Sequence, residues 1–191
     1  MNFAAPLSAL FPGTSGRLLT TLADHHRTDA ARPLPLAELS KSAAVTATQL
    51  EAALFRLGLL GLVAPRRKGE AVQLVPGHVA WGALRQLADL RGSVIALVRE
   101  EVRVRLRPAP RYLALTGPVA EGTATHAADV LELVVVPPSA VEADWHDRLT
   151  ALVADLSRDL GNVVVHRVAG DMTQAEAEAM GPNAVLVLPA R

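Results

Sequence analysis

The sequence predicts a two-domain protein of mixed α/β class, in which a mainly helical α+β first half precedes an α/β second half. Up to Arg107, leucines and valines recur at the three- and four-residue spacing of amphipathic helices. Pro108 and Pro110 then end the longest helical segment and mark a boundary. Beyond them, short apolar runs alternate with amphipathic segments, which is the order of an α/β sheet.

Composition excludes several classes of protein. The 191 residues include no cysteine, which rules out disulfides, thiol catalysis and cysteine-ligated zinc. The apolar stretches are shorter than the ~20 residues that span a bilayer, and the first residues lack the features of a signal peptide. We therefore expect a cytoplasmic protein with no membrane partner.

The formal net charge of zero conceals a division along the chain. Residues 1–111 hold 15 Lys and Arg against 8 Asp and Glu, a charge of +7, whereas residues 112–191 hold 4 against 11, a charge of −7. A basic first half suits a polyanion, and an acidic second half suits a protein partner. The alternative is that the two halves attract each other, or their counterparts in a dimer.

Three helices are expected in the first half. The first covers Ser15–Ala23, and a proline-containing loop, Asp29–Pro35, separates it from a second at Leu36–Ser42. The third begins with Thr46 as N-cap and Gln49 as its capping-box partner. Gly61 is a suitable C-terminal stop for that helix.

The next segment predicts a β-hairpin. Short apolar runs at residues 62–64 and 71–75 flank the charged turn Arg66–Glu70. This order within residues 1–77 resembles the winged helix-turn-helix domains of bacterial transcription regulators, including the ArsR-like and MarR-like groups. The resemblance implies that the third helix enters the DNA major groove, while the hairpin, or wing, reaches the backbone or minor groove.

The resemblance makes a set of polar and basic side chains the candidates for binding double-stranded DNA. Lysine and arginine side chains suit phosphates, and the threonines at the helix start suit a base edge or a phosphate. Gln49 suits adenine, although capping competes for its amide. The candidates are Lys41, Thr46, Thr48, Gln49, Arg56, Arg66, Arg67 and Lys68. Two alternatives stay open: the charged turn is an ordinary solvated tip, and the Ala- and Leu-rich helix serves protein contacts.

Residues 78–108 are expected to form one long linker helix, from Val79 to about Arg107. Its apolar positions are too dense to be covered by a small winged domain alone. The linker either dimerises, which suits two DNA half-sites, or packs against the second domain.

Residues 109–191 are expected to form the second domain. The expected elements are strands at 112–116, 130–136 and 163–168, helices at 145–160 and 173–180, and an edge strand at 184–188. This order is similar to that of the minimal nucleotidyltransferase fold.

The segment LTGPVAEGTATHAADVLELVVV, residues 115–136, resembles a nucleotidyltransferase signature without its catalytic groups. It keeps Gly117, Gly122 and Asp129. Pro118 stands where the family has serine, and Leu131 stands where it has a second aspartate. Mg²⁺ in such a site needs two or three carboxylates, and strand positions 129 and 131 would share one face. The resemblance therefore implies an inactive site with no catalytic residue, metal or cofactor.

The third carboxylate of that family is expected near Val165, where this chain offers no acid. The sequence thus favours a homodimeric DNA-binding transcriptional regulator whose inactive nucleotidyltransferase-like domain serves interaction or ligand sensing. Two alternatives stay open. One is an antitoxin-like nucleotidyltransferase that modifies a protein or RNA, and the other is a protein-interaction adaptor that does not bind DNA.

Overall fold

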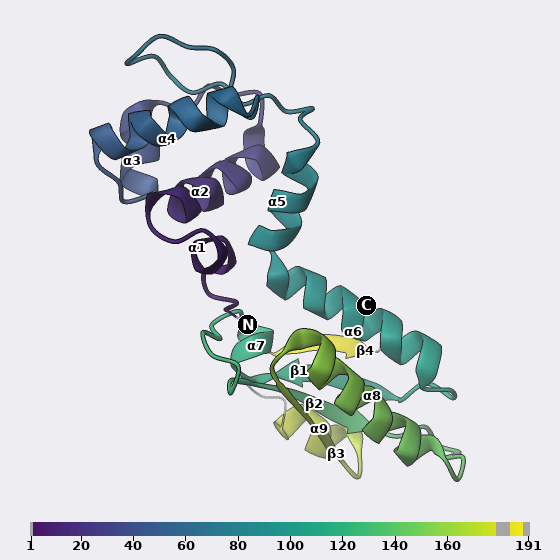
Figure 1. Cartoon of the computed structure of the whole chain (residues 1–191). Coiled ribbons are helices and arrows are strands. Elements are labelled where there is room, and N and C mark those ends of the chain that lie inside the picture. The colour runs from purple at the N-terminus through teal and green to yellow at the C-terminus, as the bar shows by residue number, and fades with distance from the viewer. Residues whose placement is uncertain (1, 179–183, 189–191) are drawn as a thin grey trace. The chain divides into compact units, whose positions relative to one another are not determined.

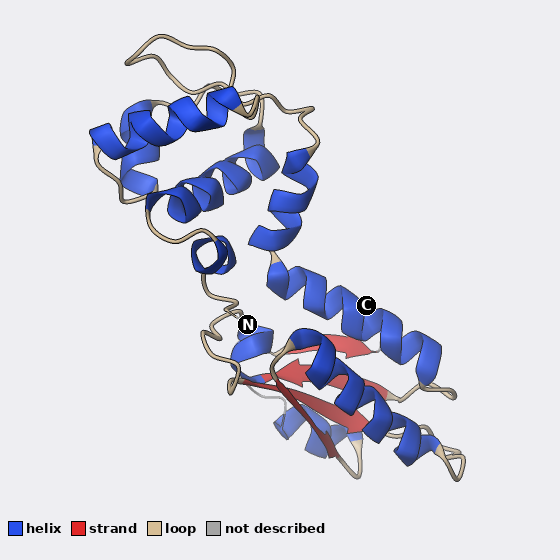
Figure 2. Cartoon of the chain, viewed as in Figure 1, coloured by secondary structure: helices blue, strands red, loops and turns tan. Residues whose placement is uncertain are grey.

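The computed structural model describes residues 2–178 and 184–188 and has the mixed α/β class that the sequence predicts (Figure 1). It divides into two compact units. One unit runs from Ala5 to Asp89, and the other combines residues 2–4 with the described residues from Leu90 onward. Figure 2 shows that the strands belong to the second unit.

The first unit consists of short helices around one core. The helices are α1 Pro6–Leu10, α2 Thr14–Asp29, α3 Leu36–Ser42, α4 Ala47–Leu59 and α5 Ala80–Ala88. Helix α3 has the predicted bounds, whereas α2 continues six residues beyond the predicted end. That extension is fixed by tertiary contacts, because His25 is buried and its Nε2 lies 2.8 Å from the carbonyl oxygen of Arg32.

Helix α4 begins and ends where the sequence predicts. Thr46 Oγ1 accepts a hydrogen bond from the Gln49 amide at 3.3 Å, and Gln49 Oε1 accepts one from the Thr46 amide at 3.0 Å. This reciprocal pair is a capping box, which satisfies two N–H groups that the helix leaves unbonded. The chain turns away at Gly61, whose φ of 76° is readily adopted by glycine.

The predicted hairpin at residues 62–75 is reduced to isolated bridges. Val63 bridges Leu74, and Val72 also bridges Leu34, which lies in the segment predicted to be a loop. Pro65 has no N–H to donate, so regular pairing does not continue toward the charged turn. Two regular strands are therefore not formed, and the predicted hairpin is present only as the antiparallel pairing of residues 62–64 with 73–75 at the base of a loop.

Leucines and one tryptophan fill the core of the first unit. Leu18 and Leu22 of α2 and Leu50 and Leu54 of α4 are almost fully buried there. Trp81 of α5 packs in the same cluster, and its Nε1 donates to the carbonyl of Val75 at 3.0 Å.

The single helix predicted over Val79–Arg107 is wrong. The chain breaks at Asp89, whose φ and ψ of −110° and 59° are not helical, and gives α5 and the separate helix α6, Leu90–Arg105. Trp81 of α5 packs in the core of the first unit, whereas Val94 of α6 packs in that of the second. The predicted linker of residues 78–108 is therefore divided between the two units at Asp89.

The second unit contains a four-stranded mixed sheet with the strand order β3-β2-β1-β4. Its strands are β1 Tyr112–Thr116, β2 Val130–Val136, β3 Val163–Val168 and β4 Val185–Leu188. Strands β2 and β3 are parallel, whereas β1 is antiparallel to both β2 and β4. The remaining helices are α7 Gly117–Glu121, α8 Trp145–Leu160 and α9 Met172–Glu178. The last two residues of the helix predicted at 173–180 lie outside the described residues.

Alternate side chains of β2 enter two different clusters, as strand geometry requires. Leu131, Leu133 and Val135 pack with α6 and α8, whereas Val134 and Val136 pack on the opposite face with α9. The α6 stripe of Val94, Val98 and Val102 is at most 6% exposed. The linker was predicted either to dimerise or to pack against the second domain, and this stripe packs within the second unit.

Candidate functional site

The exposed side of α4 is the first candidate site, and the kind of side chain that it presents changes along the helix. Leu50, Leu54 and Leu57 face the core, which leaves the opposite side of the helix to solvent. Near the N-terminus this side presents the small or polar side chains of Ala47, Thr48 and Ala52. Small side chains allow another molecule to approach the helix backbone closely.

Of the three polar candidates at the start of α4, two already have partners. Thr46 and Gln49 hold each other in the capping box, although both remain exposed. Thr48 is exposed, and its hydroxyl makes no hydrogen bond with another described residue. Thr48 is therefore the polar side chain of this set that is free to contact a ligand.

The basic candidates also separate into two kinds. Lys41 of α3, Arg56 of α4, and Arg67 and Lys68 of the 62–75 segment are exposed. Within the described part of the chain, none of these four side chains forms an ion pair. Arg66 differs, because its side chain is only 11% exposed and pairs with Glu51.

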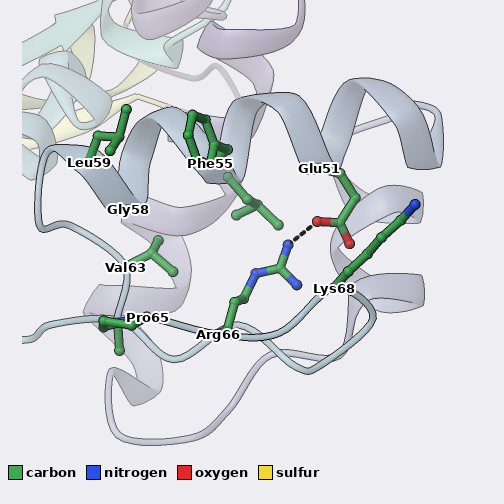
Figure 3. A pocket seen from close by; sticks show the side chains of 10 residues that line it. Glu51, Phe55, Gly58, Leu59, Val63, Pro65, Arg66 and Lys68 are labelled. Atoms are coloured by element: carbon green, nitrogen blue, oxygen red, sulfur yellow. Dashed lines mark hydrogen bonds and ion pairs between the residues drawn. The ribbon is translucent and has the colours of Figure 1, made fainter.

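Arg66 connects the 62–75 segment to α4. Its guanidinium donates to the Glu51 carboxylate (Figure 3). Through NH1 it also donates to the carbonyls of Arg67 and Glu70 at 3.2 and 3.1 Å. The hydrogen bond from Arg66 is the main reason that the pKa of Glu51 lies below its ordinary value. Arg66 was predicted to bind phosphate, but these contacts give its guanidinium a structural role.

Near its C-terminus, α4 exposes two large apolar side chains beside Arg56, which the sequence had not led us to expect. Phe55 is 69% exposed and Leu59 74%. Leu60, the residue after the helix, is 64% exposed but lines a different hollow with Phe11 and Leu18. A signal was present in the sequence, since Phe55 and Leu59 are four residues apart and lie off the Leu50 face. Exposed apolar side chains grouped in this way are typical of interaction surfaces.

A groove of about 410 Å³ runs beside this half of the helix. Figure 3 shows Glu51, Phe55, Gly58 and Leu59 along the helix edge, opposite the 62–75 segment. Val63 and Pro65 lie at the apolar end, whereas Arg66 and Lys68 lie at the charged end beside Glu51.

The segment with the nucleotidyltransferase resemblance is the second candidate site. Its glycines have structural explanations. Gly117 has a φ of 88°, and a Cβ there would lie 2.7 Å from the carbonyl oxygen of Val130. Gly122 ends α7 in the left-handed conformation. Pro118 is within α7, and Arg91 Nε donates to the carbonyl of Ala120 at 2.6 Å, so this segment is a packed helical turn.

The residues at the expected metal-ligand positions do not fit a Mg²⁺ site. Asp129 precedes β2 instead of lying on it, and its Oδ2 accepts hydrogen bonds from the amides of Thr125 at 2.7 Å and His126 at 2.9 Å. These bonds, with that from His126 the stronger cause, lower the pKa of the Asp129 carboxyl. Leu131 is fully buried in the core, and Val165 is an exposed valine. A single carboxylate, already bonded to backbone, remains.

Two further properties concern the described residues as a whole. Within residues 2–178 and 184–188, no three His, Cys, Asp or Glu side chains gather in a way that could hold a metal ion. None of the helices in these ranges has both the length and the apolar character needed to cross a bilayer.

Comparisons of the chain with protein-family models, curated proteins and solved structures found no match.

Proposed function

We propose that residues 5–89 form a winged helix-turn-helix unit that binds double-stranded DNA, and that the chain is a dimeric transcriptional regulator. The observation that carries the proposal is the N-terminal half of α4. Its start is fixed by a capping box, and its outer side presents Thr48 between small alanines. In helix-turn-helix proteins the N-terminal residues of the recognition helix contact base edges.

The exposed cations around α4 support the same proposal. Lys41, Arg67 and Lys68 are unpaired among the described residues and suit phosphate contacts. Glu51, an acid on the outer side of α4, is neutralised by Arg66. This pair lowers the repulsion that a carboxylate on the recognition helix would meet near DNA phosphates.

The second unit is proposed to be a nucleotidyltransferase-like domain without catalytic activity, which serves contact or ligand sensing. The burial of Leu131 and the backbone bonds to Asp129 support this part of the proposal, because they leave no pair of carboxylates for Mg²⁺.

A protein-interaction adaptor is the second candidate, and a specific observation favours it. Phe55 and Leu59 make one edge of the outer side of α4 apolar. An apolar surface gains nothing from a phosphate backbone, whereas it is stabilised by burial against another protein.

The test is fluorescence anisotropy of the full chain with DNA from upstream of its own gene and with a scrambled duplex, across a salt series. We expect tighter binding to the upstream DNA. Arg67→Ala with Lys68→Ala should weaken binding and lower the slope of log K against log salt by about 2, since each lost phosphate contact lowers it by about 1.

The matched control is Arg99→Ala with Arg107→Ala, which removes two exposed arginines from the second unit. This control should leave the preference for upstream DNA unchanged. If the two double variants lose the same amount of DNA affinity, binding results from general charge attraction and not from the proposed site. Absence of binding even at low salt would contradict the regulator and favour the adaptor.

A further inference from the structure

The groove between α4 and the 62–75 segment has three properties that together define what could fill it. One end is lined by apolar side chains, its floor contains a glycine, and its other end is charged. Of these properties, only the charged end is shared with the proposed DNA contacts, through Lys68.

The exposure of the groove rim indicates a large occupant. Phe55 and Leu59 keep 69% and 74% of their surface in contact with water. A small molecule inside the groove would leave most of that surface exposed. A helix laid along α4 can cover both side chains, because its own side chains recur at three- and four-residue spacing.

Gly58 keeps the floor of the groove open. Its φ is not in the left-handed region, and a Cβ there would meet no atom within 4 Å. Neither the backbone nor the neighbouring packing therefore requires glycine, although glycine weakens a helix relative to other residues. The missing side chain leaves room for an apolar side chain of another molecule.

The charged residues at the other end of the groove indicate which sign of charge the occupant carries there. Arg66 and Glu51 neutralise each other, and Lys68, an exposed residue that lines the same end, adds one positive charge. An occupant with a carboxylate at this end would complement the excess positive charge.

We propose that this groove is the docking site for an amphipathic helix of a partner protein, with apolar side chains directed to Gly58 and a carboxylate directed to Lys68. The inference does not depend on DNA binding. If the proposed function holds as well, the partner helix covers part of the recognition helix and competes with DNA.

The test uses the full chain and three synthetic helical peptides, with binding measured by fluorescence anisotropy. The first peptide carries leucines at i, i+4 and i+7 bordered by glutamates, the second has lysines in place of the glutamates, and the third is a scrambled form of the first. We expect the glutamate peptide to bind at least about tenfold more tightly than the lysine peptide. Lys68→Glu should reverse this preference.

Gly58→Leu should fill the groove and weaken binding of the glutamate peptide at least about tenfold. It should not lower the thermal stability, since leucine has the higher helix propensity and the site is open. Gly82→Leu is the matched control, because Gly82 is also an exposed helical glycine with no atom near its Cβ position. That control should leave binding unchanged.

Equal binding of the glutamate and lysine peptides, or binding that survives Gly58→Leu, would overturn the proposal. So would a dimer in sedimentation velocity that Gly58→Leu dissociates, because the occupant would then be a second copy of the chain. DNA anisotropy with the Arg67 and Lys68 variants is read separately. Failure of the peptide test is therefore distinguishable from failure of the proposed function.

Discussion

At the scale of single residues, neighbours in one basic run have different roles. Arg66 is largely buried and bonds to Glu51 and to two carbonyls, whereas Arg67 and Lys68 are exposed. Sequence alone groups the three cations, because nothing in the run shows which side chain turns back toward α4. The Glu51 carboxylate lies 15 residues earlier in the chain, so only the folded arrangement identifies it as the partner of Arg66.

The ion pair predicts a pH-dependent stability. Since folding lowers the pKa of Glu51, the pair stabilises the fold above about pH 4.3, the ordinary glutamate pKa, and this contribution is lost as the pH falls through the lowered value. At pH 7, Glu51→Gln should reduce the free energy of unfolding by about 1 kcal/mol. Urea unfolding at a series of pH values should show that this difference disappears in acid.

Glu38→Gln is the control for this prediction. Glu38 pairs with Arg32, but both side chains are nearly half exposed, so solvent screens the pair and the pH-dependent difference should be smaller. Equal behaviour of the two variants would contradict a distinct role for the Arg66–Glu51 pair.

At the scale of elements, α4 combines three sections with different consequences. The capping box fixes where the helix starts, the small residues of its first half leave the backbone accessible, and Phe55 and Leu59 make one edge of its second half apolar. Local signals predict the first section, because a cap involves residues three apart. The exposure of the other sections depends on which side of the helix the core covers.

The capping box predicts a difference between two exposed threonines. Thr46→Ala should lower the free energy of unfolding by about 1 kcal/mol, since it leaves an amide at the helix start without a partner. Thr48 is the second residue of the helix and is not its cap. Thr48→Ala should therefore change the free energy of unfolding by less than about 0.5 kcal/mol. Urea unfolding followed by Trp81 fluorescence in a Trp145→Phe background measures both.

Thr46→Ser should retain most of the stability, because serine is also a strong N-cap. A similar loss in Thr48→Ala would show that the effect does not come from the cap. Under the proposed function, Thr48→Ala should instead weaken binding to upstream DNA while leaving the fold unchanged.

At the scale of the whole molecule, the boundary between units changes the distribution of charge. Residues 5–89 hold 9 Lys and Arg against 6 Asp and Glu, a charge of +3, and the rest of the chain carries −3. The division of +7 and −7 at residue 111 is therefore reduced by more than half, because α6, with a net charge of +2, and Arg107 and Arg111 belong to the acidic unit. One of the α6 arginines, Arg105, pairs there with Asp155 at 2.7 Å.

The two units have separate cores, each with one buried tryptophan, Trp81 and Trp145. Leu54→Ala should destabilise the first core by about 2–5 kcal/mol, and Leu149→Ala should do the same in the second. Urea unfolding in Trp145→Phe and Trp81→Phe backgrounds reports each unit alone. We expect each leucine variant to shift the transition of its own unit; a joint shift of both transitions would show that the units unfold together.

By itself, the sequence determined the mixed α/β class, the capping box of α4, the bounds of α3 and α8, and strands β1, β2 and β3. These features depend on local periodicity and on turn residues, which a single chain displays directly. Tertiary structure decided the break at Asp89, the reduction of the hairpin to bridges, the burial of Leu131 and the pairing of Arg66. Each of these depends on which distant surface covers a side chain, and local spacing carries no information about that surface.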